Sequence, residues 1–67
     1  MVVLVERQMD QIEDVESYMK EKLDSDWNQL THKWQEYKVG DIKRGEFAKE
    51  ALKKVGKKFL GIFISTS

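Results

Sequence analysis

Apolar side chains recur every three or four residues along the first half of the chain, which is the spacing of one face of an α-helix. Eight of them fall on one arc when successive residues are placed about 100° apart. This set, called the apolar stripe below, comprises Met9, Ile12, Met19, Leu23, Trp27, Leu30, Trp34 and Tyr37. Acidic residues gather on the opposite side. The pattern predicts one long helix over about residues 6–38, with Gly40 placed to end it.

The segment at residues 24–26 is the weak point of that helix. Its sequence is Asp-Ser-Asp, and Ser25 could act as the N-cap of a new helix. The apolar stripe nevertheless keeps its phase through the segment, which favours a continuous helix. The alternative is a break at 24–26 that divides the chain into a three-helix bundle.

A second helix is predicted over about residues 44–60. Ile42 and Phe47 have the spacing of a hydrophobic staple around a helix start, although this places Lys43, a poor capping residue, at the N-cap. One face of the helix is apolar and carries Ala48, Ala51, Leu52, Val55, Phe59, Ile62 and Phe63. Short runs of β-favouring residues at 2–5 and 62–66 could pair as strands.

The two predicted helices differ in length. At 1.5 Å per residue, the first is about 50 Å long and the second about 25 Å. A short turn makes them an antiparallel helical hairpin, in which the second helix covers the stripe only from Tyr37 back to Leu23. Met9, Ile12 and residues 2–5 would stay open to water, which monomers avoid. We therefore expect an all-α fold with a single domain over 1–67, completed by a second copy as a four-helix dimer.

This reasoning makes the stripe a partner interface. The expected interface residues are Met9, Ile12, Glu16, Met19, Leu23, Trp27, Leu30, Trp34, Leu52, Val55, Phe59 and Phe63. Glu16 projects into the apolar arc, so it needs a cation, either Lys20 one turn along or a lysine of the partner. The predicted function is a protein–protein interaction module that self-associates or binds a helical partner as an adaptor, chaperone or inhibitor.

Charge is divided unevenly along a chain of zero net charge. Residues 1–31 carry eight acids and three bases, and residues 32–67 carry nine bases and four acids. The division is −5 against +5, which favours head-to-tail association or a basic binding surface, unless it merely reflects differently solvated helix faces. The possible basic face comprises Lys49, Lys53, Lys54, Lys57 and Lys58. It supports two alternatives, a small nucleic-acid-binding regulator and a membrane-surface amphipathic module.

The sequence contains few residues in the patterns that catalysis or metal binding requires. Cysteine is absent, so disulfides and thiol catalysis are excluded. His32 and Glu36 are one helical turn apart, but two ligands do not make a metal site. We expect no enzyme activity, no cofactor and no metal. The chain has neither an apolar run long enough to cross a bilayer nor a signal-peptide pattern, which predicts a cytoplasmic protein.

Overall fold

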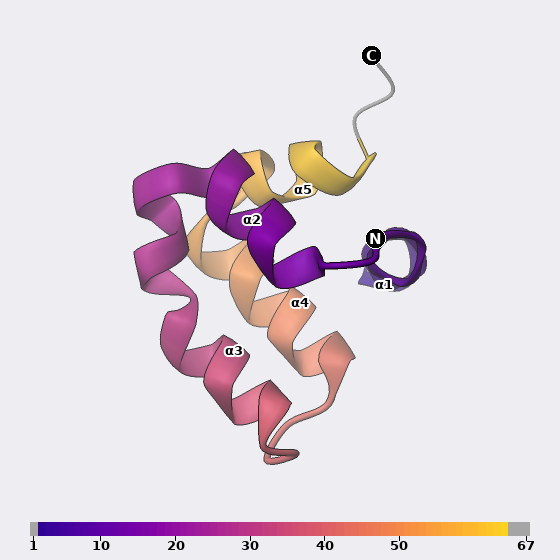
Figure 1. Ribbon diagram of the computed structural model, residues 1–67, viewed down its shortest axis with the longest axis vertical. Helices are drawn as coiled ribbons and strands as arrows, with labels where there is room; N and C mark the ends of the chain where they lie inside the picture. The colour runs from indigo at the N-terminus through magenta and orange to yellow at the C-terminus, as the bar shows by residue number, and fades with distance from the viewer. Residues whose placement is uncertain (1, 65–67) are drawn as a thin grey trace.

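The computed structural model describes residues 2–64, and every regular element in that range is a helix (Figure 1). In chain order these are α1 (Val2–Gln11), α2 (Val15–Leu23), the 3₁₀ helix η1 (Asp24–Gln29), α3 (Thr31–Lys38), α4 (Arg44–Lys54) and α5 (Lys57–Ile64). The all-α prediction is confirmed for this range. The suggested strands are helical instead, with residues 2–5 in α1 and 62–64 in α5. Residues 65 and 66 lie outside the described range.

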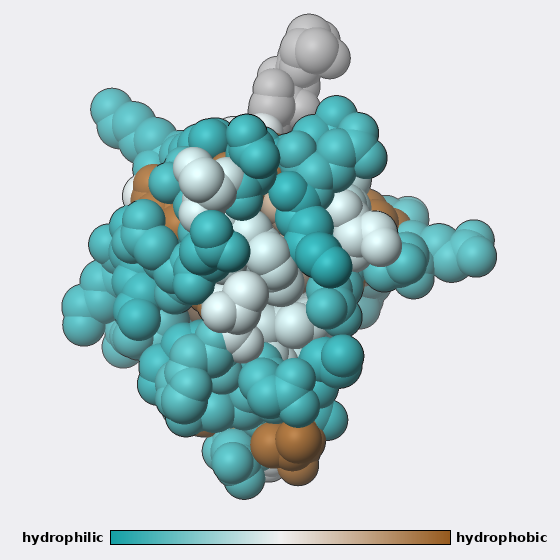
Figure 2. All heavy atoms as spheres, turned by 60° about the vertical axis from the view of Figure 1, so that its left-hand side comes forward, coloured by the Kyte–Doolittle hydropathy of each residue, from teal (hydrophilic) through white to brown (hydrophobic). Residues whose placement is uncertain are grey.

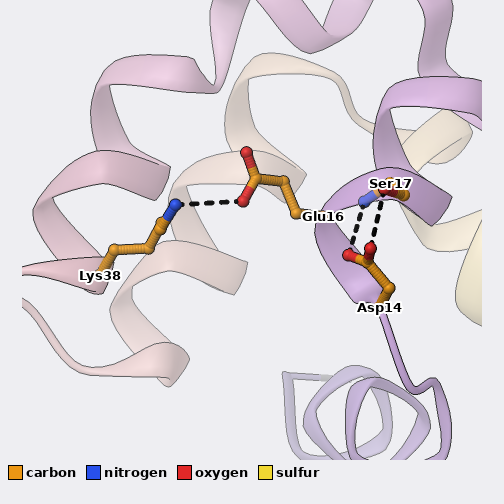
Figure 3. A network of polar contacts seen from close by, with 4 residues as sticks. All are labelled: Asp14, Glu16, Ser17 and Lys38. Atoms are coloured by element: carbon orange, nitrogen blue, oxygen red, sulfur yellow. Dashed lines mark hydrogen bonds and ion pairs between the residues drawn. The ribbon is translucent and has the colours of Figure 1, made fainter.

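The predicted continuous helix over residues 6–38 is wrong, and its first interruption lies at residues 12–14. There the Asp14 side chain caps α2: one carboxylate oxygen accepts the Ser17 backbone N–H at 3.1 Å, and the other accepts the Ser17 hydroxyl at 2.9 Å (Figure 3). An aspartate that satisfies a free N–H in this way starts a new helix. α1 is thereby released to take a different direction from α2.

The second interruption follows Leu23, so the alternative of a break at 24–26 is confirmed. Asp24 has φ 54° and ψ −123°, a conformation outside both the helical and the strand regions. The chain then continues as η1 rather than as an α-helix. The break gives five α-helices in residues 2–64 and not the three of the alternative bundle, because the chain is also interrupted at 12–14 and after Lys54.

The second predicted helix is also divided. α4 begins at Arg44 as expected, and Lys43 occupies the N-cap without a side-chain capping bond. It ends at Lys54 because Gly56 adopts φ +70°, the left-handed conformation that closes helices at a glycine. α5 then starts at Lys57, so the prediction of one helix to residue 60 is wrong.

The core lies between the helices, which pack around one cluster of apolar side chains. Figure 1 shows α1 nearly end-on beside α4 and α5, and α1 packs against both. α3 and α4 pack together after the turn through Gly40, whose φ of +87° suits glycine. The buried apolar residues are Val5, Met9, Met19, Leu23, Trp27, Leu30, Trp34, Phe47, Ala48, Ala51, Phe59 and Phe63. They form one cluster to which each of the α-helices and η1 contribute.

Candidate functional site

The apolar stripe is buried inside a single chain. Met19, Leu23 and Leu30 are fully buried, and Trp27 and Trp34 are only 6% and 7% exposed. From the second half of the chain, Phe59 and Phe63 are buried, whereas Leu52 and Val55 are half-buried against the same cluster. The structure therefore brings the predicted interface residues together, but as the core of the protomer.

The expectation that a lone chain leaves Met9 and Ile12 open to water is wrong. Met9 is 4% exposed and Ile12 is half-buried. Because the helix is interrupted at 12–14, α1 turns onto α4 and α5 instead of extending past them. The prediction of a second copy rested on the difference in length between the two predicted helices. Since the long helix does not form, that difference does not exist.

A chain of aromatic contacts runs through this core. Trp34 meets Trp27 edge-on, with ring centroids 6.1 Å apart, and meets Phe47 at 5.1 Å. Phe47 continues to Phe59 at 6.1 Å, and Phe59 to Phe63 at 5.1 Å. These tilted and edge-on geometries are the favourable arrangements for aromatic pairs. η1 and α3 are thus tied to α4 and α5 by large rigid side chains.

The sequence reasoning left two central residues out of the interface set. Phe47 is fully buried at the middle of the aromatic chain, and Val5 is fully buried from α1. The staple spacing with Ile42 accounts for Phe47 only as a residue at the helix start. Its position four residues before Ala51, on the apolar face of α4, was the available signal.

Glu16 meets its cation within the chain. Its carboxylate lies 3.2 Å from the Lys38 ammonium on α3, and not against Lys20 one turn along (Figure 3). The Trp34 indole N–H does not reach hydrogen-bonding geometry with any of the described residues. It nevertheless lies close enough to the Glu16 carboxylate to stabilise its negative charge. Trp34, and after it Lys38, hold the pKa of Glu16 below its ordinary value.

Three further ion pairs link the acidic and basic halves of the chain. Arg44 on α4 pairs with Asp10 on α1, and its Nε lies 3.7 Å from the Glu6 carboxylate. Lys58 on α5 lies 3.0 Å from the Asp26 carboxylate in η1. Together with the Glu16–Lys38 pair, each joins a residue from the first 31 to one that follows. The charge division therefore serves contacts inside the protomer.

The possible basic face is only partly free. Lys53 lies 4.0 Å from Glu50, and Lys58 pairs with Asp26. Lys49, Lys54 and Lys57 are exposed and make no ion pair within residues 2–64. The structure thus separates two engaged lysines from three that are available at the surface of α4 and α5.

Two surface hollows are lined by polar side chains. One, of about 300 Å³, is bordered by α3 and α4 through Lys33, Glu46, Lys49, Glu50 and Lys53. The other, of about 610 Å³, lies on α1. Sites for small molecules are usually concave and largely apolar. These hollows carry side chains of both charges instead, so neither resembles such a site.

Other candidate chemistry is also sparse. His32 lies 3.2 Å from Glu36, and no group of three metal-binding side chains occurs within residues 2–64. In the same range, no helix combines the length and the apolar character required to span a membrane. Figure 2 shows the face formed when the left side of Figure 1 comes forward: it is mainly hydrophilic, and the strongly hydrophobic spheres stand apart from one another.

Comparison with known proteins adds no relative. No protein-family model, curated protein or solved structure matches this chain.

Proposed function

We propose that this chain is a small protein–protein interaction module that self-associates through the apolar stripe. The observation that carries the proposal is that the core is a contact between two complementary parts of the chain. Residues 2–23 supply α1 and α2, and residues 31–64 supply α3, α4 and α5. α1 packs on α4 and α5, and α2 packs on α5. The ion pairs between the parts join acidic side chains of the first to basic side chains of the second.

Surfaces that recognise each other within one chain can recognise each other between two copies. The same apolar stripe then forms the core of a helical dimer, and the ion pairs set the orientation of the two chains. A binding role also agrees with the surface of the described residues, where both hollows are lined by polar and charged side chains.

The exposed apolar side chains define the competing interface. Val3 is 63% exposed and Leu4 is 49% exposed on the outer face of α1. Val39, 62% exposed, follows α3. If two folded protomers associated through their exposed surfaces, the dimer would bury exposed apolar side chains such as Val3, Leu4 and Val39. A dimer that forms through the apolar stripe would leave these side chains in water.

Sedimentation after refolding at micromolar to millimolar chain concentrations tests the proposal. Wild type should shift from the chain mass to twice that mass, with helical circular dichroism unchanged. The double variant Val3→Ser/Leu4→Ser should dimerise equally well, and Val39→Ser is the control for loss of an exposed apolar group elsewhere. A wild type that stays monomeric contradicts self-association. A dimer lost only in the double variant places the interface on α1 and contradicts the role of the stripe.

Nucleic-acid binding is the second candidate, favoured by the three exposed lysines on α4 and α5. Phosphate contacts by Lys49, Lys54 and Lys57 would lose affinity steeply as salt rises. Titration of a DNA duplex at two salt concentrations tests this candidate, with Lys49→Gln/Lys54→Gln/Lys57→Gln compared with Lys20→Gln/Lys22→Gln on α2. Equal affinity of both variants would exclude the basic face as the binding surface.

A further inference from the structure

The connection between α2 and α3 is held in a strained shape. Asp24 combines φ 54° with ψ −123°, a region that glycine enters easily and that side chains with a Cβ avoid. It is the one residue other than glycine with positive φ in residues 2–64. Asp24 is the first of the six residues of η1, and a stretch of 3₁₀ helix between α-helices often marks a hinge.

The sequence of this connection suits a straight helix better than a bend. From Met19 through Leu23, Trp27, Leu30 and Trp34 to Tyr37, the intervals are 4, 4, 3, 4 and 3 residues. These average 3.6, the period of the α-helix. If residues 24–30 became α-helical, α2 and α3 would join over residues 15–38 with the stripe on one face throughout.

A straight helix over residues 15–38 cannot keep both packing contacts of the closed protomer, in which α2 packs on α5 and α3 packs on α4. Its 24 residues would span about 35 Å, as long as the whole folded chain, whose longest dimension is 33 Å. Figure 1 shows how the bend at η1 lets α2 lie near α5 while α3 runs beside α4. Straightening therefore separates residues 2–23 from their own α4 and α5, and it exposes both sides of the core.

We infer that residues 24–30 are a hinge whose straightening exchanges residues 2–23 between two copies of this chain. The inference rests on the proposed self-association and specifies how it occurs. In the exchanged dimer, α1 and α2 of each copy occupy the place that their equivalents hold in the closed protomer. Only the hinge adopts a new conformation, which is why exchange of a segment is a low-cost route to a dimer.

The contacts that close the protomer would be restored between the copies. They include the Asp10–Arg44 and Glu16–Lys38 ion pairs and the hydrogen bond that the Tyr18 hydroxyl donates to the Ile62 carbonyl. The strain at Asp24 would be relieved in both copies. Two contacts at the bend oppose opening, because Lys58 on α5 donates a hydrogen bond to the Leu23 carbonyl at 3.3 Å and lies 3.0 Å from the Asp26 carboxylate.

Two substitutions at Asp24 should shift the equilibrium in opposite directions. Asp24→Ala keeps a Cβ in the strained conformation and favours the straight helix, so it should raise the dimerisation constant about tenfold. Asp24→Gly relieves the strain in the bend and disfavours the helix, so it should lower the constant by a similar factor. Sedimentation equilibrium after refolding at high concentration measures both, and Ser25→Ala serves as a control beside the strained position.

Cysteine pairing shows which copy supplies α1. A Cβ placed on Gly45 would lie 3.8 Å from the Cγ1 methyl of Val2, so α1 and α4 bring these two positions side by side and a cysteine at each can be tested for pairing. The chain has no cysteine of its own. Monomeric Val2→Cys/Gly45→Cys should first form the bond within one chain, which verifies the geometry. Val2→Cys and Gly45→Cys chains are then mixed, refolded together at high concentration and oxidised.

Exchange predicts a disulfide between a Val2→Cys chain and a Gly45→Cys chain, which links the two chains as a covalent dimer. This bond should form in preference to a disulfide between two Val2→Cys chains or between two Gly45→Cys chains. Chains mixed as folded monomers at low concentration should give little of it. A dimer without this bond leaves the proposed self-association standing and overturns the exchange. Equal dimerisation of Asp24→Ala and Asp24→Gly also overturns it. The absence of any dimer in all variants overturns both proposals.

Discussion

The Lys58 ammonium on α5 lies 3.0 Å from the Asp26 carboxylate and 3.3 Å from the Leu23 carbonyl oxygen. Leu23 is the last residue of α2, where carbonyl groups lose their partners within the helix. One side chain from near the end of the chain thus caps α2 and neutralises an acid in η1. This contact joins the bend between α2 and α3 to the helix on which α2 packs.

Replacement of Lys58 should loosen the bend. Lys58→Met removes the ion pair with Asp26 and the hydrogen bond to the Leu23 carbonyl. We expect the free energy of unfolding to fall by only about 0.5–1 kcal/mol, because the Lys58 and Asp26 side chains are both partly exposed to water. Urea denaturation measures the change. Lys57→Met, at the exposed neighbouring position, should match wild type. Equal stability of Lys57→Met and Lys58→Met would show that the contact does not stabilise the fold.

Phe47 should be among the most sensitive residues of the core. It is fully buried and lies between Trp34 and Phe59 in the aromatic chain. Phe47→Ala should reduce the free energy of unfolding by about 3–5 kcal/mol, a large part of what a small domain possesses. Thermal melting followed by near-ultraviolet circular dichroism measures the loss, and Phe47→Leu should recover much of it. Melting of Phe47→Ala like wild type would contradict the packing described.

Two glycines of the C-terminal helices should respond oppositely to alanine. Gly56 has φ +70°, so Gly56→Ala should destabilise the fold by about 1–2 kcal/mol. Gly61 lies within α5, and a Cβ there would meet no other atom within 4 Å. Gly61→Ala should therefore stabilise the fold by about 0.5–1 kcal/mol. Urea denaturation of the two variants provides the comparison, and changes of the same sign would contradict the assigned helix boundary.

Stability should fall with acidification through two carboxyl groups of α2. The Ser17 backbone N–H and hydroxyl lower the pKa of Asp14, and the Trp34 N–H followed by Lys38 lowers that of Glu16. A lowered pKa in the folded state means that the stabilisation is present above the ordinary carboxyl value. It is lost as pH falls from the ordinary carboxyl pKa values, 3.8 for Asp14 and 4.5 for Glu16, through the lowered ones.

Variants that do not titrate should weaken this dependence. Asp14→Asn keeps an oxygen that caps α2, and Glu16→Gln keeps a similar shape without the charge. Each should lose less stability than wild type when urea denaturation is compared at about pH 7 and about pH 3. Variants whose losses parallel that of wild type would show that other groups govern the acid response.

The helical class and the core residues could be predicted because both follow from local periodicity. An amphipathic spacing identifies the side chains that are buried, whichever element covers them. Sequence periodicity therefore predicts the burial of Met19, Leu23, Trp27 and Trp34. The start of α4 was predictable for the same reason, since the staple spacing depends only on near neighbours.

The sequence by itself determined an all-helical chain with a stripe of core residues and opposite charges in its two halves. Only the tertiary structure decided that the chain bends between α2 and α3 and which side chains cover the stripe. A stripe with unbroken phase is compatible with a straight helix and with a bent chain, because both turn the same side chains inward. The bend forms where distant groups stabilise it, as Lys58 does beside Asp26, and no local pattern can report a contact across 32 positions of the sequence.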